Sequence, residues 1–221
     1  MTDRTKTTRI LWGAGTSRTI RPHWALAELG LAYEHRPIGP RTGETQTPEF
    51  TALNARQKIP VLQDGDLILT ESAAIVIYLS DTYGGDGNRL VPADPAGRAR
   101  CLEWCFFVIS ELDATSLYVM RRHGDLAHIY GEAPQANEAA AAYFQKQMRS
   151  VERALDLGAP YLLGDHFTAA DLLLSTCLTW AVRYSVAIPD VAAAYNARVT
   201  ARPAYAAAVA RNTPPARAGR P

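Results

Sequence analysis

The amino-acid sequence predicts an α/β domain followed by an all-α domain. Strand and helix signals alternate over residues 8–84, and only helical patterns follow the glycine- and proline-containing segment 85–93. Alternation followed by a long helical stretch is typical of a mixed sheet with packed helices, joined to a helix bundle. We expect the helical domain to span 94–211, with 85–93 as the linker and 212–221, which contains three prolines, as a flexible tail.

Each element of the first domain has a recognisable signal. Short apolar and β-branched runs predict strands, and Asp64-Gly65-Asp66 marks a hairpin turn. One helix ends before Gly30, and another begins at Thr47 with Pro48 in its first turn. Together these elements imply a small mixed sheet with helices on it. The strands are expected at 8–12, 33–38, 61–63 and 67–70, and the helices at 21–29, from 47 onward and at 72–83.

The second domain is expected to contain helices and no sheet. Asp94 and Pro95 form an N-cap and first-turn pair. Thr168 and Asp171 have the spacing of a capping box, in which two side chains satisfy backbone donors at the start of a helix. A catalytic carboxylate at Asp171 is the alternative, and we favour the folding role. The helices are expected at 94–122, 135–157 and 168–186, with shorter ones after residue 189.

Composition and charge exclude several classes of protein. Hydrophobic residues make up 48% of the 221-residue chain and charged residues 20%, which describes a folded globular protein. A formal net charge of +1 gives no reason to expect nucleic acid or an anionic membrane as a partner. No apolar run approaches the ~20 residues that span a bilayer. The polar residues 1–8 lack a secretory core, so we expect a cytoplasmic protein.

The cysteines indicate neither a redox pair nor a metal site. Cys101 and Cys105 lie one helical turn apart among aromatic residues, and Cys177 lies in an apolar helix, so buried structural thiols are expected. Cys-x-x-Cys spacing is absent from the sequence, which disfavours a dithiol oxidoreductase. No His/Cys cluster has zinc spacing either, and we expect no metal.

The segment 54–62 and the pair Glu71-Ser72 are the most informative part of the chain. Pro60 removes a backbone donor at the start of a short apolar strand. It also pushes Ile59 towards an extended conformation, which leaves the main-chain groups of Ile59 free to pair with another molecule. The hairpin then leads to a helix that begins at Glu71-Ser72. A free backbone edge near a helix N-terminus predicts a site for a small peptide that carries a carboxylate.

Four segments, taken in order along the chain, resemble the soluble glutathione S-transferases. Their order covers residues from about 8 to 211. The resemblance implies a thioredoxin-like arrangement of the first domain, glutathione as co-substrate, and a homodimer. The segments are 10–18 running into 24–34, 58–62 followed by 69–75, 167–172, and 201–205.

The resemblance places the catalytic hydroxyl in the loop before the first helix. A free thiol with a pKa of ~8.5 is mostly protonated near neutral pH, and a donor to sulfur favours the thiolate. Thr16 and Ser17 occupy the two positions used by serine-type members, and we favour Ser17; simple helix capping is the alternative. Arg18 stands where cysteine-type members have Cys, which argues against reductase activity, and it is a third candidate for polarising the sulfur. The tyrosine-type signature is absent, which points to a bacterial, serine-type-like member.

The family's glutathione contacts carry over to five residues. Ile59 is expected to pair its N–H and C=O with the cysteinyl backbone of glutathione, and Pro60 to be cis. Ser72 and the helix N-terminus suit the γ-glutamyl carboxylate, and Glu71 suits the ammonium group. Lys58 is expected to reach the glycyl carboxylate, with a solvated turn lysine as the alternative.

The expected activity is conjugation of glutathione to a small apolar electrophile, as in detoxification. Its pocket is expected along the long helix from residue 94, although aromatic residues at helical spacing also suit a core. A glutathione-dependent isomerase of the maleylacetoacetate type, a reductive dehalogenase and a non-catalytic glutathione-binding protein are the alternatives. The candidate pocket residues are Trp104, Phe107, Glu111 and Tyr118.

Overall fold

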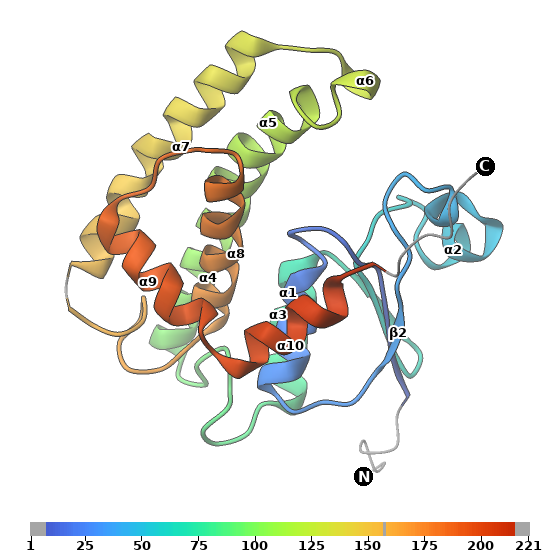
Figure 1. The fold of residues 1–221 in the computed structure, drawn as a ribbon. Coiled ribbons are helices and arrows are strands. Elements are labelled where there is room, and N and C mark those ends of the chain that lie inside the picture. Colours follow the sequence, from blue (N-terminus) through green and yellow to red (C-terminus); the bar gives the residue numbers. More distant parts are fainter. Residues whose placement is uncertain (1–7, 157, 215–221) are drawn as a thin grey trace. The chain divides into compact units, whose positions relative to one another are not determined.

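A computed structural model of the chain describes residues 8–156 and 158–214 (Figure 1). These residues form two compact units. The first contains the described residues up to Leu90 together with those from Arg202 onward, and the second is Val91–Ala201. The first unit contains a sheet with helices and the second contains helices, so the predicted fold class is confirmed.

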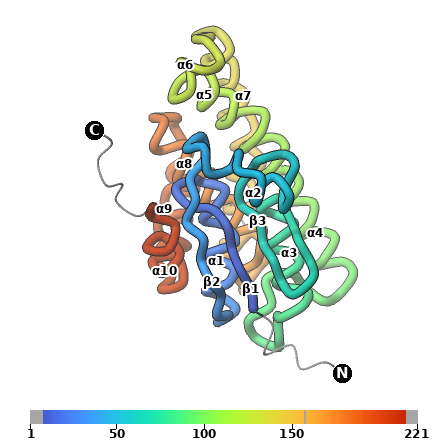
Figure 2. The backbone as a smooth tube through the Cα atoms, turned by 90° about the vertical axis from the view of Figure 1, so that its right-hand side faces the viewer, coloured from blue at the N-terminus to red at the C-terminus, as the bar shows by residue number. Residues whose placement is uncertain are grey.

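The described part of the first unit contains one four-stranded mixed sheet in the order β2-β1-β3-β4. β1 runs parallel to β2, because the chain crosses over through a helix, and antiparallel to β3, which forms a hairpin with β4. Figure 2 shows β2, β1 and β3 side by side. In the register, Trp12 pairs with Val61, which pairs in turn with Thr70. The strands are Arg9–Trp12 (β1), Glu34–Arg36 (β2), Val61–Asp64 (β3) and Leu67–Thr70 (β4).

The helices of the first unit cover both faces of this sheet. α1 and α3 pack together on one face, and α2 lies on the opposite side (Figures 1 and 2). The predicted start of α2 is confirmed, since the Thr47 hydroxyl accepts a hydrogen bond from the Phe50 N–H at 3.2 Å. The core between the sheet and α1 and α3 includes Leu11, Trp24, Leu62 and Ile75, all fully buried. The bounds are Ile20–Glu28 (α1), Glu44–Gln46 (the short helix η2), Pro48–Leu53 (α2) and Ser72–Tyr83 (α3).

α10 (Pro203–Asn212) also belongs to the first unit, where it packs along α1 (Figure 1). The Arg202 guanidinium donates to both carboxylate oxygens of Glu28, at 2.6 and 2.7 Å. The rings of Trp24 and Tyr205 meet edge to face, with centroids 4.7 Å apart. The sequence pattern predicts this helix in the second domain and a tail that begins at Asn212, because an alanine-rich helical pattern does not reveal which core it packs against. In the structure Asn212 ends α10, and residues 215–221 of the expected tail lie outside the described residues.

The second unit begins at the predicted cap, where the Asp94 carboxylate accepts from the Gly97 N–H at 2.7 Å. The long helix expected at 94–122 is interrupted by η3, a ten-residue π-helix. Within η3, the Thr115 hydroxyl donates to the carbonyl of Ser110, five residues earlier, at 2.6 Å. The helices are Pro95–Phe107 (α4), Val108–Leu117 (η3), Tyr118–His123 (α5), Ala127–Tyr130 (α6), Pro134–Leu155 (α7), Ala169–Arg183 (α8) and Asp190–Thr200 (α9).

The predicted capping box at the start of α8 is confirmed and has a wider role. The buried Asp171 carboxylate accepts from the Thr168 N–H at 2.8 Å, as the spacing predicts. It also accepts from the Leu162 N–H at 2.8 Å and from the Tyr195 hydroxyl at 2.6 Å. Burial raises the pKa of this carboxyl, and the hydrogen bonds oppose that shift. One carboxylate thus holds α8, α9 and the preceding loop together.

The three cysteines are buried, as predicted, and none forms a disulfide within the described residues. No helix in the described ranges is long and apolar enough to cross a membrane.

Candidate active site

The loop between β1 and α1 is held close to the proline turn. The Gly13 N–H donates to the Arg36 carbonyl at 2.9 Å, and the Ala14 N–H donates to the Ile38 carbonyl at 3.0 Å. Gly13 has φ +113°, and a Cβ atom on it would lie 2.7 Å from the Ile59 Cβ. Glycine is therefore needed here for both its backbone conformation and its lack of a side chain. The structure brings the predicted catalytic loop and Ile59 into contact at this point.

The hydroxyls of Thr16 and Thr19 are fully engaged in hydrogen bonds, within the loop and to Asn212. Thr16 Oγ1 accepts from the N–H groups of Arg18 and Thr19, at 3.2 and 3.0 Å. The two threonine oxygens lie 3.0 Å apart, and Thr19 Oγ1 donates to Asn212 Oδ1 at 2.6 Å. Because the Asn212 oxygen can only accept, the proton between the threonines belongs to Thr16. Thr16 thus has no proton left for a ligand.

Ser17 differs from both threonines. It is half-buried, and within 8–156 and 158–214 its hydroxyl has no hydrogen-bond partner. The hydroxyl is therefore available to donate to a bound group. The two adjacent candidates thus differ in their partners, because Thr16 caps the turn while Ser17 has no such bond among the described residues. Arg18 contributes its backbone N–H to that cap.

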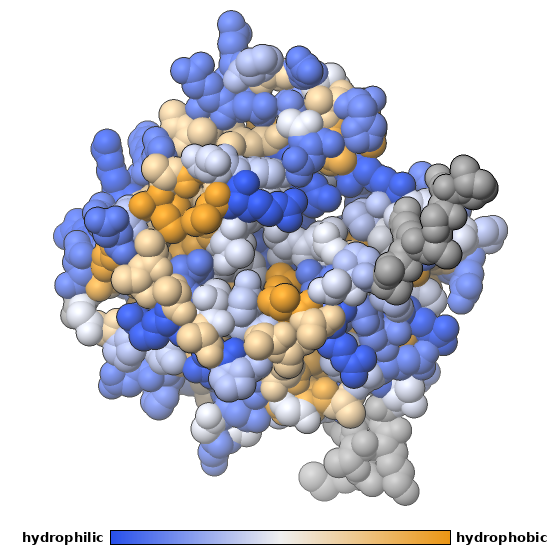
Figure 3. Space-filling view, viewed as in Figure 1, coloured by the Kyte–Doolittle hydropathy of each residue, from blue (hydrophilic) through white to orange (hydrophobic). Residues whose placement is uncertain are grey.

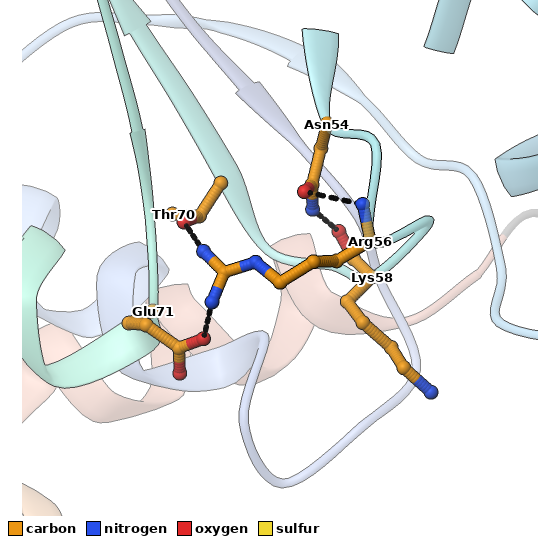
Figure 4. Close-up of polar contacts among 5 residues, drawn as sticks. All are labelled: Asn54, Arg56, Lys58, Thr70 and Glu71. Carbon is orange, nitrogen blue, oxygen red and sulfur yellow. Dashed lines mark hydrogen bonds and ion pairs between the residues drawn. The ribbon is translucent and has the colours of Figure 1, made fainter. Parts of the chain in front are cut away.

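The proline turn has the predicted backbone. The Ile59–Pro60 peptide bond is cis, as expected. Asn54 organises the turn: its side-chain amide donates to the Lys58 carbonyl at 2.8 Å and accepts from the Arg56 N–H at 3.1 Å (Figure 4). The N–H and C=O of Ile59 have no partner among the residues that the structure describes. Both groups are therefore available to pair with an extended peptide.

Glu71 lies at the start of α3 and is paired with Arg56, for which the sequence pattern predicts no role. Its carboxylate accepts from the Arg56 guanidinium at 2.9 Å, and the same guanidinium donates to the Thr70 hydroxyl (Figure 4). Both side chains of the ion pair are exposed. Glu71 has φ +69°, a conformation that non-glycine residues seldom adopt. The Lys58 side chain extends away from this cluster.

Ser72 is buried at the first position of α3, and a second unexpected arginine supports it. Arg21, fully buried on α1, donates to the Ser72 hydroxyl at 3.2 Å. The first backbone hydrogen bond of α3 runs from the Ile75 N–H to the Glu71 carbonyl, and no side chain caps the helix. Free N–H groups, the helix dipole and the Arg21 charge all favour an anion here. A charged residue among the apolar positions of the first helix was the available signal for Arg21.

Two histidine side chains lie within hydrogen-bond distance of the Gly13 carbonyl oxygen. His23 Nε2 lies 3.2 Å from this carbonyl oxygen and His35 Nε2 lies 3.4 Å from it. Burial lowers the pKa of His23 to about 4 and also lowers that of His35. His23 is therefore neutral near pH 7, donates through Nε2, and accepts from the Tyr33 hydroxyl through Nδ1, at 2.7 Å. These contacts fit a structural role for His23.

The residues predicted for the second-substrate pocket lie in the second unit. The rings of Trp104 and Phe107 meet edge to face, with centroids 5.5 Å apart. The Glu111 carboxylate, in η3, accepts from the Tyr143 hydroxyl at 2.5 Å. Tyr118 begins α5. Their assignment to an electrophile pocket stays a prediction. Among the described residues no group of three or more His, Cys, Asp or Glu side chains has the arrangement of a metal site.

A mixed sheet with a cis-proline turn and an uncapped helix start, joined to a helical unit, defines a thioredoxin-like domain followed by an all-α domain. Residues 7–81 match the family described as "Glutathione S-transferase, N-terminal domain", and residues 134–211 match "Glutathione S-transferase, C-terminal domain". These two matches cover most of both units.

Individual proteins agree with the family matches. A glutathione S-transferase of Triticum aestivum is 29% identical over 215 residues, which is 94% of this chain and 95% of the relative. Glutathione S-transferase 3 of Zea mays is 32% identical over 164 residues, 69% of this chain and 68% of the relative. A theta-class glutathione S-transferase from Xanthomonas axonopodis pv. citri, solved with glutathione bound, superposes with a TM-score of 0.75 at 28% identity. That similarity covers 92% of this chain and 97% of the solved one.

The chain therefore belongs to the glutathione S-transferase family, and the predicted class of enzyme is confirmed.

Proposed function

We propose that the protein binds glutathione in the first unit and that Ser17 activates the glutathione thiol for attack on a small apolar electrophile. The observation that carries this assignment is the hydroxyl of Ser17, which has no hydrogen-bond partner in the described part of the chain, beside a Thr16 hydroxyl whose bonds lie within the loop. This arrangement supports a serine-type mechanism. The solved relative from Xanthomonas, which has glutathione bound, supports the choice of ligand.

The geometry supports a specific placement of glutathione. The free N–H and C=O of Ile59 pair with the cysteinyl backbone, which brings the thiol towards the loop that Gly13 holds against Ile59. The γ-glutamyl carboxylate binds at the start of α3, where Ser72, the free backbone N–H groups and Arg21 favour negative charge. Glu71 pairs with the ammonium group.

The glycyl carboxylate lies at the other end of the tripeptide. Lys58 and Arg56 lie two and four residues before Pro60, and Lys58 has no ion-pair partner in the described part of the chain. Either cation suits a flexible, solvent-facing carboxylate. The site thus holds glutathione by its two ends and its middle, and leaves the sulfur to Ser17.

Catalysis then follows from the protonation state of the sulfur. The hydrogen bond from Ser17 favours the thiolate, and each pKa unit corresponds to ~1.4 kcal/mol. The thiol proton leaves to water. The sulfur forms a bond to the electrophilic carbon, and the leaving group departs with its electron pair. The protein supplies orientation and charge stabilisation, and glutathione is the nucleophile.

Two further expectations belong to this proposal. We infer a homodimer in the cytoplasm, and exposed apolar residues support an interface: Leu67 and Ile68 on β4 are 39% and 44% exposed, and Phe106 on α4 is 67% exposed. On the face drawn in Figure 3, apolar residues form separate clusters among hydrophilic ones. Light scattering that reports a monomer of about the chain mass of 24.1 kDa at micromolar concentration would contradict the dimer.

Thiolate absorbance against pH tests the function directly. With saturating glutathione, Ser17→Ala is expected to raise the pKa of the bound thiol and to lower turnover of a chlorinated nitroaromatic, with little change in glutathione affinity. Thr16→Ala and Arg18→Ala serve as comparisons at the neighbouring positions. A shift in Thr16→Ala or Arg18→Ala but not in Ser17→Ala would refute the choice of residue. Absent turnover with unshifted titrations in all three would favour a non-catalytic glutathione-binding protein.

A further inference from the structure

The last described helix ends on the loop that carries Ser17. α10 is anchored at its start by the Arg202–Glu28 ion pair and packs along α1 in the same unit. These contacts fix the direction of the helix, so that its final residue, Asn212, reaches the loop between β1 and α1. The contact joins residues separated by almost the whole length of the chain.

Asn212 contacts the loop on both sides of Ser17. Before Ser17, its carbonyl oxygen accepts from the Gly15 N–H at 2.8 Å, and its Oδ1 lies 3.2 Å from the same nitrogen. After Ser17, Oδ1 accepts from Thr19 Oγ1 at 2.6 Å. The Asn212 amide also donates to the Thr16 carbonyl at 3.1 Å. The main chain and side chain of Asn212 together therefore clamp the segment in which Ser17 lies.

These bonds set the direction of every proton in the threonine network. Asn212 Oδ1 accepts a hydrogen bond from the hydroxyl of the fully buried Thr19. Thr19 Oγ1 in turn accepts from the Thr16 hydroxyl and from the Thr16 N–H. In Asn212→Ala the Thr19 hydroxyl keeps only the Thr16 carbonyl, 3.0 Å away, as an acceptor. The Gly15 N–H keeps the main-chain carbonyl of residue 212 but loses Oδ1, and the Thr16 carbonyl loses the Asn212 amide, so the loop is held less firmly on both sides of Ser17.

The chain beyond Asn212 closes over the same loop. Gly15 has φ +82°, and a Cβ atom on it would lie 2.8 Å from Pro214 Cγ. Gly15 therefore has room only for a hydrogen atom at this point. This packing is a second observation, independent of the hydrogen bonds, that the end of α10 and the loop are fitted to each other.

We infer that Asn212 is a positioning residue, which orients the Ser17 hydroxyl towards the glutathione sulfur by fixing the loop on both sides of it. The inference rests on the proposed role of Ser17. It gives the last residue of α10 a part in thiol activation, because a hydrogen bond to sulfur requires that the donor hydroxyl be held in one direction.

The test measures the pKa of bound glutathione and the steady-state constants of four full-length variants. Asn212→Ala and Thr19→Val each remove one side of the clamp, and Ser17→Ala removes the proposed donor. Thr213→Ala is the matched control, since the Thr213 hydroxyl bonds only to the Val209 carbonyl of its own helix among the described residues. Asn212→Ala is expected to raise the thiol pKa by about one unit, roughly a tenfold change in the thiol–thiolate equilibrium, and to lower kcat more than it raises KM. Thr19→Val is expected to act in the same direction, and it keeps the test open if Asn212→Ala does not fold.

The double variant Ser17→Ala/Asn212→Ala decides whether Asn212 acts through Ser17. The expected thiol pKa of the double variant equals that of Ser17→Ala alone. Additive shifts, or a shift in Ser17→Ala with none in Asn212→Ala and Thr19→Val, would overturn the positioning role while leaving Ser17 in place. An unshifted Ser17→Ala would instead overturn the proposed function, and the inference with it.

Discussion

The guanidinium of Arg21 and the hydroxyl of Ser72 meet at 3.2 Å, where α1 passes the first turn of α3. Both residues are buried, with Arg21 fully inaccessible and Ser72 6% exposed. A buried cation behind an uncapped helix start strengthens the attraction for an anion, since screening by water is reduced there. This pair therefore links the packing of the first unit to the proposed carboxylate site.

The first prediction follows from this pair. Arg21→Met keeps most of the side-chain volume but removes the charge, and Ser72→Ala removes the hydroxyl. Each change is expected to weaken glutathione binding by about 1.5 kcal/mol, roughly tenfold, as expected for a charge-assisted contact. Titration calorimetry measures the effect. Arg149→Met, an exposed change of the same charge, is the control. Unchanged affinity in both site variants would mean that the carboxylate binds elsewhere.

The second prediction concerns the loop contact at Gly13. Gly13→Ala places a Cβ against Ile59 at a positive φ, and we expect a loss of about 1–3 kcal/mol in unfolding free energy together with weaker glutathione binding. Gly30→Ala is the matched control, because Gly30 has φ +65° but no atom within 4 Å of the added Cβ. Urea unfolding and calorimetry measure the two effects. Equal losses of binding in both variants would show that backbone strain, not the Ile59 contact, is responsible.

The third prediction concerns the buried carboxylate of the second unit. Asp171→Asn replaces an acceptor of several N–H and O–H groups with an amide whose nitrogen cannot accept, and Tyr195→Phe removes one donor. We expect losses of about 1.5–3 kcal/mol for Asp171→Asn and about 1 kcal/mol for Tyr195→Phe in unfolding free energy. Urea unfolding gives both values. Tyr205→Phe, which keeps the ring contact with Trp24, is the control and should change little.

The fourth prediction is a pH dependence of stability. The pKa of His23 falls from 6.5 to about 4 on folding, because burial disfavours the charged imidazole. Between these values the unfolded chain binds a proton that the folded protein does not, so stability is complete above about pH 6.5 and is lost as pH falls towards 4. The loss from this group amounts to at most about 3 kcal/mol.

Urea unfolding at pH 7.5 and 5.0 measures this dependence. His23→Gln is expected to have a smaller difference in unfolding free energy between the two pH values, because the titrating group is gone. His166→Gln, at an exposed position, should keep the full difference. If His23→Gln and the parent lost the same stability on acidification, the neutral buried state of His23 would not be the cause. His35, whose pKa is lowered in the same direction, contributes to what remains.

Local interactions made several elements predictable. Thr47, Asp94 and Asp171 each bond to a backbone group three residues away, so the cap and its helix lie in one short stretch of sequence. The helix expected at 72–83 has the same bounds in the structure as α3. The cis-proline turn and the start of α3 were likewise readable, because Pro60 restricts its own neighbours.

Contacts between distant segments were not predictable in this way. The π-helical η3 was expected as ordinary α-helix, since the hydroxyl bonds to carbonyls five residues earlier have no distinct sequence pattern. Arg56 has no distinguishing signal in the sequence, and the charge of Arg21 among apolar helix positions does not say what it meets; folding placed the two beside Glu71 and Ser72. The different partners of Thr16 and Ser17 were not predictable either, because adjacent hydroxyls differ only in the contacts that folding gives them, and the role of Ser17 stays a proposal.

The sequence by itself thus determined the two kinds of domain, the helix starts and the glutathione motif, because caps, turns and hydrophobic periodicity act over a few residues. The tertiary structure alone decided that α10 packs on α1 and that Asn212 ends at the loop of Gly15 and Thr19. Such contacts depend on the packing of the whole first unit. The side chains that meet there are separated by nearly two hundred residues, and no local pattern records which of them will be neighbours.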